Sequence, residues 1–175
     1  MADRQTVLGS LGAAGCIEGP RLRLEAMGPQ QAAELWRIYG EDAPLRQANG
    51  GAPAAATPEE FYAVGQRWAD HVEGVTFAVV TRSDDRAIGT ISLSRLSRPR
   101  VSIGYWLASP HWGIGLGGEA FDLVLQVARR AGLTAVEADN ITSEASMRIW
   151  RRRNAQVSVG AGGRYSCVLS LKDEP

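Results

Sequence analysis

Hydrophobic and polar residues follow two periods in the N-terminal half of the chain. Residues 21–24 alternate polar and apolar side chains, which predicts a short first strand. Apolar side chains recur every three or four residues over 29–40, and this spacing predicts a helix. A second helix is predicted from Pro58 to about His71, because Thr57 before the proline is a strong N-cap.

The part of the chain after residue 74 begins with three apolar stretches separated by short polar turns. Such short turns require antiparallel pairing of the three strands. Helical and extended patterns then alternate. The elements predicted after residue 74 are strands 75–82, 87–96 and 100–107, a helix over 119–131, a strand over 134–138, a helix over 143–153, and a hairpin of strands 156–159 and 165–171.

The predicted element order is β-α-α-β-β-β-α-β-α-β-β. It indicates an α+β fold with one mixed, mostly antiparallel sheet flanked by helices. Residues 41–56 carry Pro, Gly and Ala without a period and are expected to form a loop. Residues 1–16 hold few strongly apolar side chains and are interpreted as a flexible leader, and residues 17–175 as a single domain.

Composition excludes several classes of protein. The 19 basic and 19 acidic side chains give zero net charge, which offers no electrostatic footprint for nucleic acid. The lone lysine, Lys172, excludes mechanisms that need an interior lysine. The two cysteines and two histidines fit no metal or disulfide pattern, and no apolar run is long enough to span a membrane. We therefore expect a cytoplasmic protein with no metal, no nucleic-acid partner and no membrane partner.

Glycines gather between the predicted strand 100–107 and helix 119–131. The segment Gly113-Ile114-Gly115-Leu116-Gly117-Gly118 lets the backbone approach a ligand with its N–H groups turned inward. We interpret it as a phosphate cradle that needs no lysine, the alternative being a flexible turn before a helix. The spacing also fits the dinucleotide fingerprint, but antiparallel strands precede it and too few residues follow for a second mononucleotide-binding half.

These residues resemble the GNAT superfamily of acetyl-CoA-dependent N-acetyltransferases, which carries a Q/R-x-x-G-x-G/A motif between a strand and the next helix. Gly115 and Gly117 stand at the glycine positions, and Trp112 stands where Gln or Arg often does. The resemblance extends over residues 17–171, with the same element order. The strings that resemble the ribosomal-protein (Rim-type) branch are Arg21-Leu22-Arg23-Leu24, Ile88-Gly89-Thr90-Ile91, Ile103-Gly104-Tyr105-Trp106-Leu107, Pro110, Trp112-Gly113-Ile114-Gly115 and Glu119-Ala120.

Four positions depart from the family pattern. Ser102 replaces a Glu that often precedes Ile-Gly-Tyr, and residues 143–146 keep the Ser of an N-x-x-S motif without its Asn. Trp150 stands where many members have a general-acid Tyr, and Asn154-Ala155 stands where Gly-Phe is usual. These departures concern the catalytic residues and leave the glycine motif intact.

The resemblance implies a binding mode for acetyl-CoA as co-substrate. The diphosphate would lie over the backbone of the glycine segment, and the pantetheine would pair like an extra strand with residues 106–108. The backbone N–H of Leu107 would polarise the thioester carbonyl. The residues expected to bind the cofactor are Trp106, Leu107, Ala108, Trp112, Gly113, Ile114, Gly115, Leu116, Gly117, Gly118 and Ser146.

Ser146 is the candidate acid toward the leaving sulfur, although a serine near the start of a helix is also explained as a cap. Glu137 is the candidate base, with Asp139 two residues further on. A solvated strand end and a water-relayed proton are the alternatives. Glu119 is expected to serve the helix dipole and to point away from the loop. The arginines 151–153 either complement the helix dipole or contact the 3′-phosphate of CoA.

The acceptor is defined only as a primary amine, of a protein N-terminus or of a small molecule. Trp36, Tyr39 and Glu41 belong to the region that walls the acceptor site in this fold, although aromatic residues at helical spacing are also typical of a core. The predicted function is an acetyl-CoA-dependent N-acetyltransferase that acts by direct attack, and the resemblance suggests a homodimer. A non-catalytic CoA-binding module and a nicotinamide-dependent enzyme of Rossmann-like fold are the alternatives.

Overall fold

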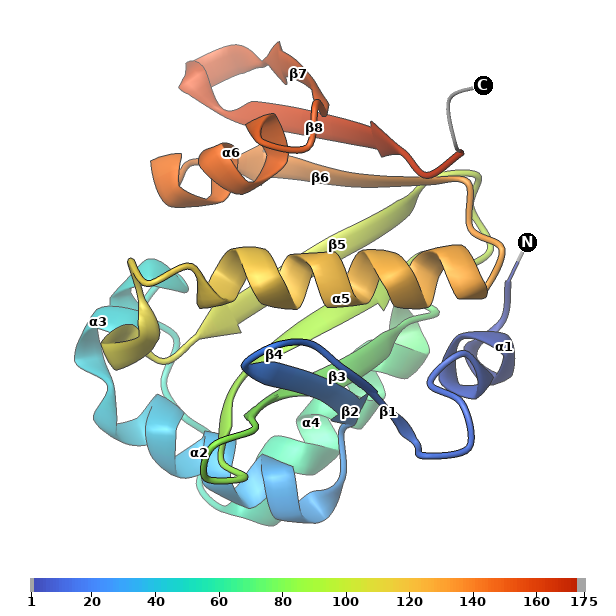
Figure 1. The fold of residues 1–175 in the computed structure, drawn as a ribbon. Helices are drawn as coiled ribbons and strands as arrows, with labels where there is room; N and C mark the ends of the chain where they lie inside the picture. The colour runs from blue at the N-terminus through green and yellow to red at the C-terminus, as the bar shows by residue number, and fades with distance from the viewer. Residues whose placement is uncertain (1, 173–175) are drawn as a thin grey trace.

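Residues 2–172, which the computed structural model describes, form a mixed sheet of eight strands in the order β1-β2-β3-β4-β5-β6-β8-β7. Helices lie on both faces of this sheet (Figure 1). The elements in chain order are α1 (Arg4–Gly9), β1 (Cys16–Glu18), β2 (Leu22–Ala26), α2 (Pro29–Glu41), α3 (Ala43–Ala48), α4 (Pro58–His71), β3 (Val75–Thr81), β4 (Ala87–Ser94), β5 (Val101–Leu107), the short 3-10 helix η1 (Ser109–His111), α5 (Leu116–Arg130), β6 (Ala135–Ile141), α6 (Glu144–Arg151), β7 (Gln156–Val159), η2 (Ala161–Gly163) and β8 (Tyr165–Ser170).

The two faces of the sheet are covered by different helices. The long helix α5 crosses one face, and α2 and α4 lie on the other (Figure 1). Phe121 and Val124 of α5 are buried in the larger core, because the apolar residues of that helix share one side. On the opposite face, Leu35 of α2 packs against Ala78 and Val80 of β3. The predicted α+β architecture with a mostly antiparallel sheet is confirmed.

The strands β5 and β6 separate along most of their length. They are the parallel neighbours of the sheet, and the pairs Val101–Val136 and Ser102–Glu137 make up their described pairing. From residue 103 onward, β5 keeps β4 on one side and a gap on the other. This gap places one edge of the β5 backbone within reach of a ligand.

Residues 2–16, the described part of the segment that the sequence predicted to be a flexible leader, contain a helix and the first residue of β1. The helix α1 is capped by Asp3, whose Oδ1 accepts a hydrogen bond from the Thr6 N–H at 2.8 Å. Val7 and Leu11 are buried in the main core, and β1 pairs with β2. Two apolar side chains are enough to dock one short helix, but too few to produce a period in the sequence.

A second difference lies in the predicted loop over residues 41–56, which contains α3. The Oδ1 of Asp42 caps this helix by accepting from the Leu45 N–H at 2.9 Å, and Leu45 is buried. The helix predicted from Pro58 to His71 is confirmed at both ends. The helix predicted over 119–131 instead begins three residues earlier, inside the glycine segment.

Candidate active site

The glycine segment between β5 and α5 is a turn in which two glycines take a left-handed conformation. Gly113 and Gly115 have φ values of +76° and +86°, and Gly115 is the N-cap of α5. The first N–H groups of a helix have no partner within that helix and carry its partial positive charge. Here they face the space in front of α5, which is the geometry that an anion-binding cradle requires.

Two side chains hold the start of this turn. The indole Nε1 of Trp112 donates to the carbonyl of Leu107 at 2.7 Å. The Oδ2 of Asp42 accepts from the Ser109 N–H at 2.6 Å. Burial raises the pKa of Asp42, but the hydrogen bonds from Ser109 and Leu45 outweigh it and lower the pKa below its usual value. Asp42 is therefore a fixed, ionised anchor of the turn.

Glu119 fixes the other end of the turn to β2. Its Oε1 accepts from the N–H groups of Arg21 and Leu22 at 2.7 and 2.9 Å, and its Oε2 pairs with the Arg21 Nε at 2.8 Å. Arg21 also donates to the carbonyl of Ile114 at 2.9 Å. These bonds lower the pKa of Glu119 although burial opposes the shift. Glu119 therefore has a structural role, as expected, but it joins the turn to the start of β2 instead of pointing away from the loop.

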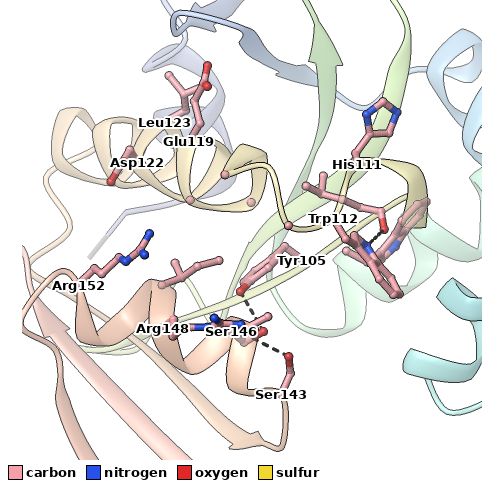
Figure 2. Close-up of a pocket in the computed structure, with 18 of the residues that line it drawn as sticks. Tyr105, His111, Trp112, Glu119, Asp122, Leu123, Ser143, Ser146, Arg148 and Arg152 are labelled. Carbon is pink, nitrogen blue, oxygen red and sulfur yellow. Dashed lines mark hydrogen bonds between the residues drawn. The ribbon is translucent and has the colours of Figure 1, made fainter.

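A cleft of about 980 Å³ opens in front of the turn, between α5 and α6, and is called the glycine cleft below (Figure 2). Among the predicted cofactor residues, Ala108, Ile114 and Leu116 do not line it: Ala108 and Leu116 are buried, and Ile114 is exposed elsewhere. The predicted cofactor residues that do line it are Trp106, Leu107, Trp112, Gly113, Gly115, Gly117, Gly118 and Ser146.

Ser146 lies in the wall of the glycine cleft beside Tyr105, which comes from β5 (Figure 2). The two hydroxyl oxygens are 3.0 Å apart and hydrogen-bonded. The Ser146 N–H donates to the Ser143 Oγ at 3.3 Å, so the N-cap of α6 is Ser143 and the Ser146 hydroxyl remains available. Burial raises the pKa of Tyr105, partly opposed by the bond to Ser146, so this phenol stays protonated at neutral pH.

The amide of Leu107 faces the gap beside β5. The N–H of Ala108 donates to the carbonyl of Ile88 at 2.8 Å, and so points toward β4. Since successive residues of an antiparallel strand direct their backbone groups to opposite sides, the Leu107 N–H points away from β4. The backbone here is closely packed, because a Cβ on Gly89 would lie 2.2 Å from the Trp106 carbonyl oxygen.

A smaller cavity of about 230 Å³ lies where β5 and β6 separate and is called the strand gap. It shares Tyr105, Ser143 and Ser146 with the glycine cleft. Its other side carries Asp139 and Asn140, which are exposed at a bulge of β6. The two cavities therefore meet at the pair of hydroxyls.

The structure does not bring four of the predicted catalytic and acceptor-site residues to either cavity. Glu137 pairs with Ser102 at the closed end of the strand gap, and its carboxylate lies 3.7 Å from Arg95. Trp36 and Tyr39 donate hydrogen bonds to the carbonyls of Ala55 and Ala52 and so hold the loop before α4. Glu41 is exposed and does not line either cavity.

The comparison with known families decides the identity of this fold. A family model described as the acetyltransferase (GNAT) domain matches residues 21–152. The chain belongs to the GNAT acetyltransferase family. It is an acetyl-CoA-dependent N-acetyltransferase, as the sequence motifs predicted.

Solved structures share the GNAT fold with this chain. A ribosomal-protein-S5-alanine acetyltransferase from Vibrio fischeri is 17% identical, with a TM-score of 0.69 over 91% of this chain and 99% of that one. RimJ from Mycobacterium smegmatis, in complex with CoA-disulfide, is 16% identical, with a TM-score of 0.66 over 90% and 88% of the two chains. A GCN5-related N-acetyltransferase from Brucella melitensis is 23% identical, with a TM-score of 0.65 over 89% and 77%. No curated protein matches the chain.

The GNAT assignment and the sheet topology exclude the Rossmann-like alternative. A dinucleotide-binding fold needs a run of parallel strands, whereas β1 to β5 are successive antiparallel neighbours. The glycine cleft fits the diphosphate of acetyl-CoA, because it offers free helix N–H groups rather than a lysine.

Among residues 2–172, no helix combines the length and the apolar character needed to cross a membrane.

Proposed function

We propose that this GNAT protein transfers an acetyl group from acetyl-CoA to the primary amine of a protein N-terminus or a small molecule, by direct attack. The observation that carries the proposal is the meeting of the two cavities at Ser146 and Tyr105. A donor in the glycine cleft and an acceptor in the strand gap would present their reacting atoms to the same pair of hydroxyls. Such positioning supplies much of the rate of a two-substrate reaction.

The cleft binds the donor through backbone groups. The turn at Gly113 and Gly115, with the N-terminus of α5, takes the diphosphate. The edge of β5 at residues 106–108, on the side away from β4, takes the pantetheine amides as an additional strand would. When bound, acetyl-CoA supplies an electrophilic thioester carbonyl.

Two groups of the chain then act on the reacting atoms. The Leu107 N–H donates to the carbonyl oxygen as negative charge develops there, an effect worth about 10²–10³ in rate for one preorganised donor. As the amine nitrogen bonds to the carbonyl carbon and the carbon–sulfur bond breaks, the Ser146 hydroxyl gives its proton to the sulfur. Tyr105, which donates a hydrogen bond to the Ser146 Oγ, restores that proton. Tyr105 is itself reprotonated through water by the proton that the attacking nitrogen loses as the amide forms.

The acceptor side of the site is open and weakly acidic. Asp139 is exposed at the rim of the strand gap and supplies a carboxylate toward an incoming ammonium group. The amine must lose a proton before attack, and water in this open cavity carries it away. Glu137 has no part in this step, because it lies at the closed end of the gap.

Substitution of the serine tests the proposal. Ser146→Ala is expected to lower kcat by about 10–100-fold while the KM for acetyl-CoA changes little, because the lost proton donor acts only as the thiol leaves. The measurement is release of free thiol from acetyl-CoA over a panel of peptide N-termini and small amines. Ser158→Ala, an exposed serine on β7, is the matched control and should behave as the wild type.

Two outcomes would count against the proposal. A wild-type kcat in Ser146→Ala would remove the serine from the chemistry. Calorimetric binding of acetyl-CoA to the wild-type protein without thiol release for any amine would instead favour a non-catalytic CoA-binding role.

A further inference from the structure

The charges that line the glycine cleft do not cancel. Four arginines and two carboxylates lie in its wall. Glu119 is neutralised by Arg21, at 2.8 Å, and Asp122 by Arg153, at 2.6 Å. Two arginines therefore remain as a surplus of positive charge on one side of the cleft.

The surplus consists of Arg148 and Arg152, both on the α6 side of the cleft (Figure 2). They are four residues apart, which places them on the same face one turn from each other. Both are exposed, and within residues 2–172 neither guanidinium makes a hydrogen bond or an ion pair. Two unpaired guanidinium groups one turn apart are suited to a single multivalent anion.

The neighbouring arginines, Arg151 and Arg153, have protein partners. The unpaired state of Arg148 and Arg152 is therefore not a general property of the arginines in this segment. Arg151 pairs with Glu144 at 3.5 Å, lies over the ring of Tyr165, and does not line the cleft. Arg153 donates to the carbonyls of Ile149 and Gly118, at 2.7 and 2.8 Å, and thereby joins α6 to α5. The turn of the helix leaves Arg148 and Arg152 directed at the cleft, without a side-chain partner in the described part of the chain.

CoA carries two separate anionic groups, its diphosphate and its 3′-phosphate. The N-terminal turn of α5 already offers backbone N–H groups for the diphosphate. Resting on the function proposed above, we propose that Arg148 and Arg152 bind the 3′-phosphate and make the enzyme selective for CoA over dephospho-CoA. A phosphate monoester carries nearly two negative charges at neutral pH, and each guanidinium can offer it a bidentate contact.

Isothermal titration of CoA and dephospho-CoA tests the proposal, because these ligands differ only in the 3′-phosphate. The wild-type protein is expected to bind CoA at least about tenfold more tightly, the amount that one charge-assisted hydrogen bond supplies. Arg148→Gln and Arg152→Gln should each reduce this ratio, and the double variant should bring it close to one. Arg151→Gln makes the same charge change one residue away and should keep the wild-type ratio.

The outcomes separate this proposal from the proposed function. Equal binding of CoA and dephospho-CoA by the wild type would overturn the phosphate assignment while leaving CoA binding intact. An equal loss of affinity for CoA and dephospho-CoA in Arg148→Gln and Arg152→Gln would also overturn it, because the arginines would then bind the diphosphate that both ligands carry. Failure of the wild type to bind either ligand would instead overturn the donor site itself.

Discussion

Glu119 shows how a carboxylate can line a cleft for an anionic ligand without repelling it. Its oxygens accept from the N–H groups of Arg21 and Leu22 and from the Arg21 guanidinium, and its side chain is only 11% exposed. The same contacts tie the glycine turn to β2 through Arg21 and Ile114. The residue thus stabilises the shape of the cleft rather than its charge.

The first prediction concerns Glu119. Glu119→Gln should lower the free energy of unfolding at pH 7 by about 1–3 kcal/mol, because it removes hydrogen bonds to a charged acceptor. The pKa of Glu119 is lower in the folded protein, so this contribution is complete above its ordinary value of about 4.3 and is lost as the pH falls through the folded value. Urea unfolding at pH 7 and at successively lower pH should show the two proteins converging.

Glu41→Gln is the control for this measurement, since Glu41 is exposed at the end of α2. A stability difference between wild type and Glu119→Gln that stayed constant at low pH would contradict the role of the ionised carboxylate.

At the scale of elements, the turn between β5 and α5 does most to define the site. It combines two left-handed glycines, the N-terminus of a 15-residue helix, and two anchors, Arg21 just before β2 and Asp42 at the N-cap of α3. Helix α5 has at its other end another left-handed glycine, Gly132, with φ of +76° and open space around it. The two glycines share a backbone conformation, but only Gly115 lines the glycine cleft.

This pair allows a matched test. Gly115→Glu and Gly132→Glu should each lose about 1 kcal/mol of stability, because both force a side chain into the left-handed region. Only Gly115→Glu should abolish CoA binding in calorimetry, since it places a negative charge in the cradle. Retained affinity in Gly115→Glu would remove the diphosphate from this turn.

The sequence predicted those elements that carry a clear local signal. Thr57-Pro58 marks the start of α4, and the turns 83–86 and 97–99 separate β3, β4 and β5 correctly. It missed α3, because Leu45 is the one buried side chain of that helix and gives no period.

The sequence also could not place every site residue. It located the glycine turn and Ser146, which depend on local spacing. It assigned Glu137 to the site, whereas this residue lies away from both cavities. That position follows from the register of β6 against β5, which the sequence does not show. It did not separate Arg148 and Arg152 from their neighbours either, because their roles depend on how α6 is rotated against α5.

At the scale of the whole molecule, the N-terminal helix belongs to the same core as the site. Val7 is fully buried in the cluster that contains Phe121 of α5, and Arg4 forms an ion pair with Asp70 of α4. The segment before β1 thus packs against α5, the helix whose N-terminus forms the cradle (Figure 1).

Truncation of one side chain tests this support. Val7→Ala should lower the free energy of unfolding by about 1–3 kcal/mol, because it removes buried methyl groups and leaves a cavity. Leu8→Ala, at a neighbouring position where the side chain is 37% exposed, should change it by less than half as much. Thermal unfolding of both variants measures the difference. Negligible effects of both substitutions on the free energy of unfolding would mean that this segment does not support the core, and would favour the flexible leader that the sequence predicted for residues 1–16.

The short pairing of β5 and β6 leaves side chains to join the two parts of the sheet. Phe121 on α5 and Trp150 on α6 meet edge to face at 4.8 Å, and Arg153 bridges the same two helices to Asp122. The spacing of the two parts is therefore set by a few interhelical contacts rather than by the hydrogen-bond ladder. Substitutions among these contacts can widen or narrow the strand gap while the ladder stays intact, so the size of this cavity can change without any change in the pairing of its strands.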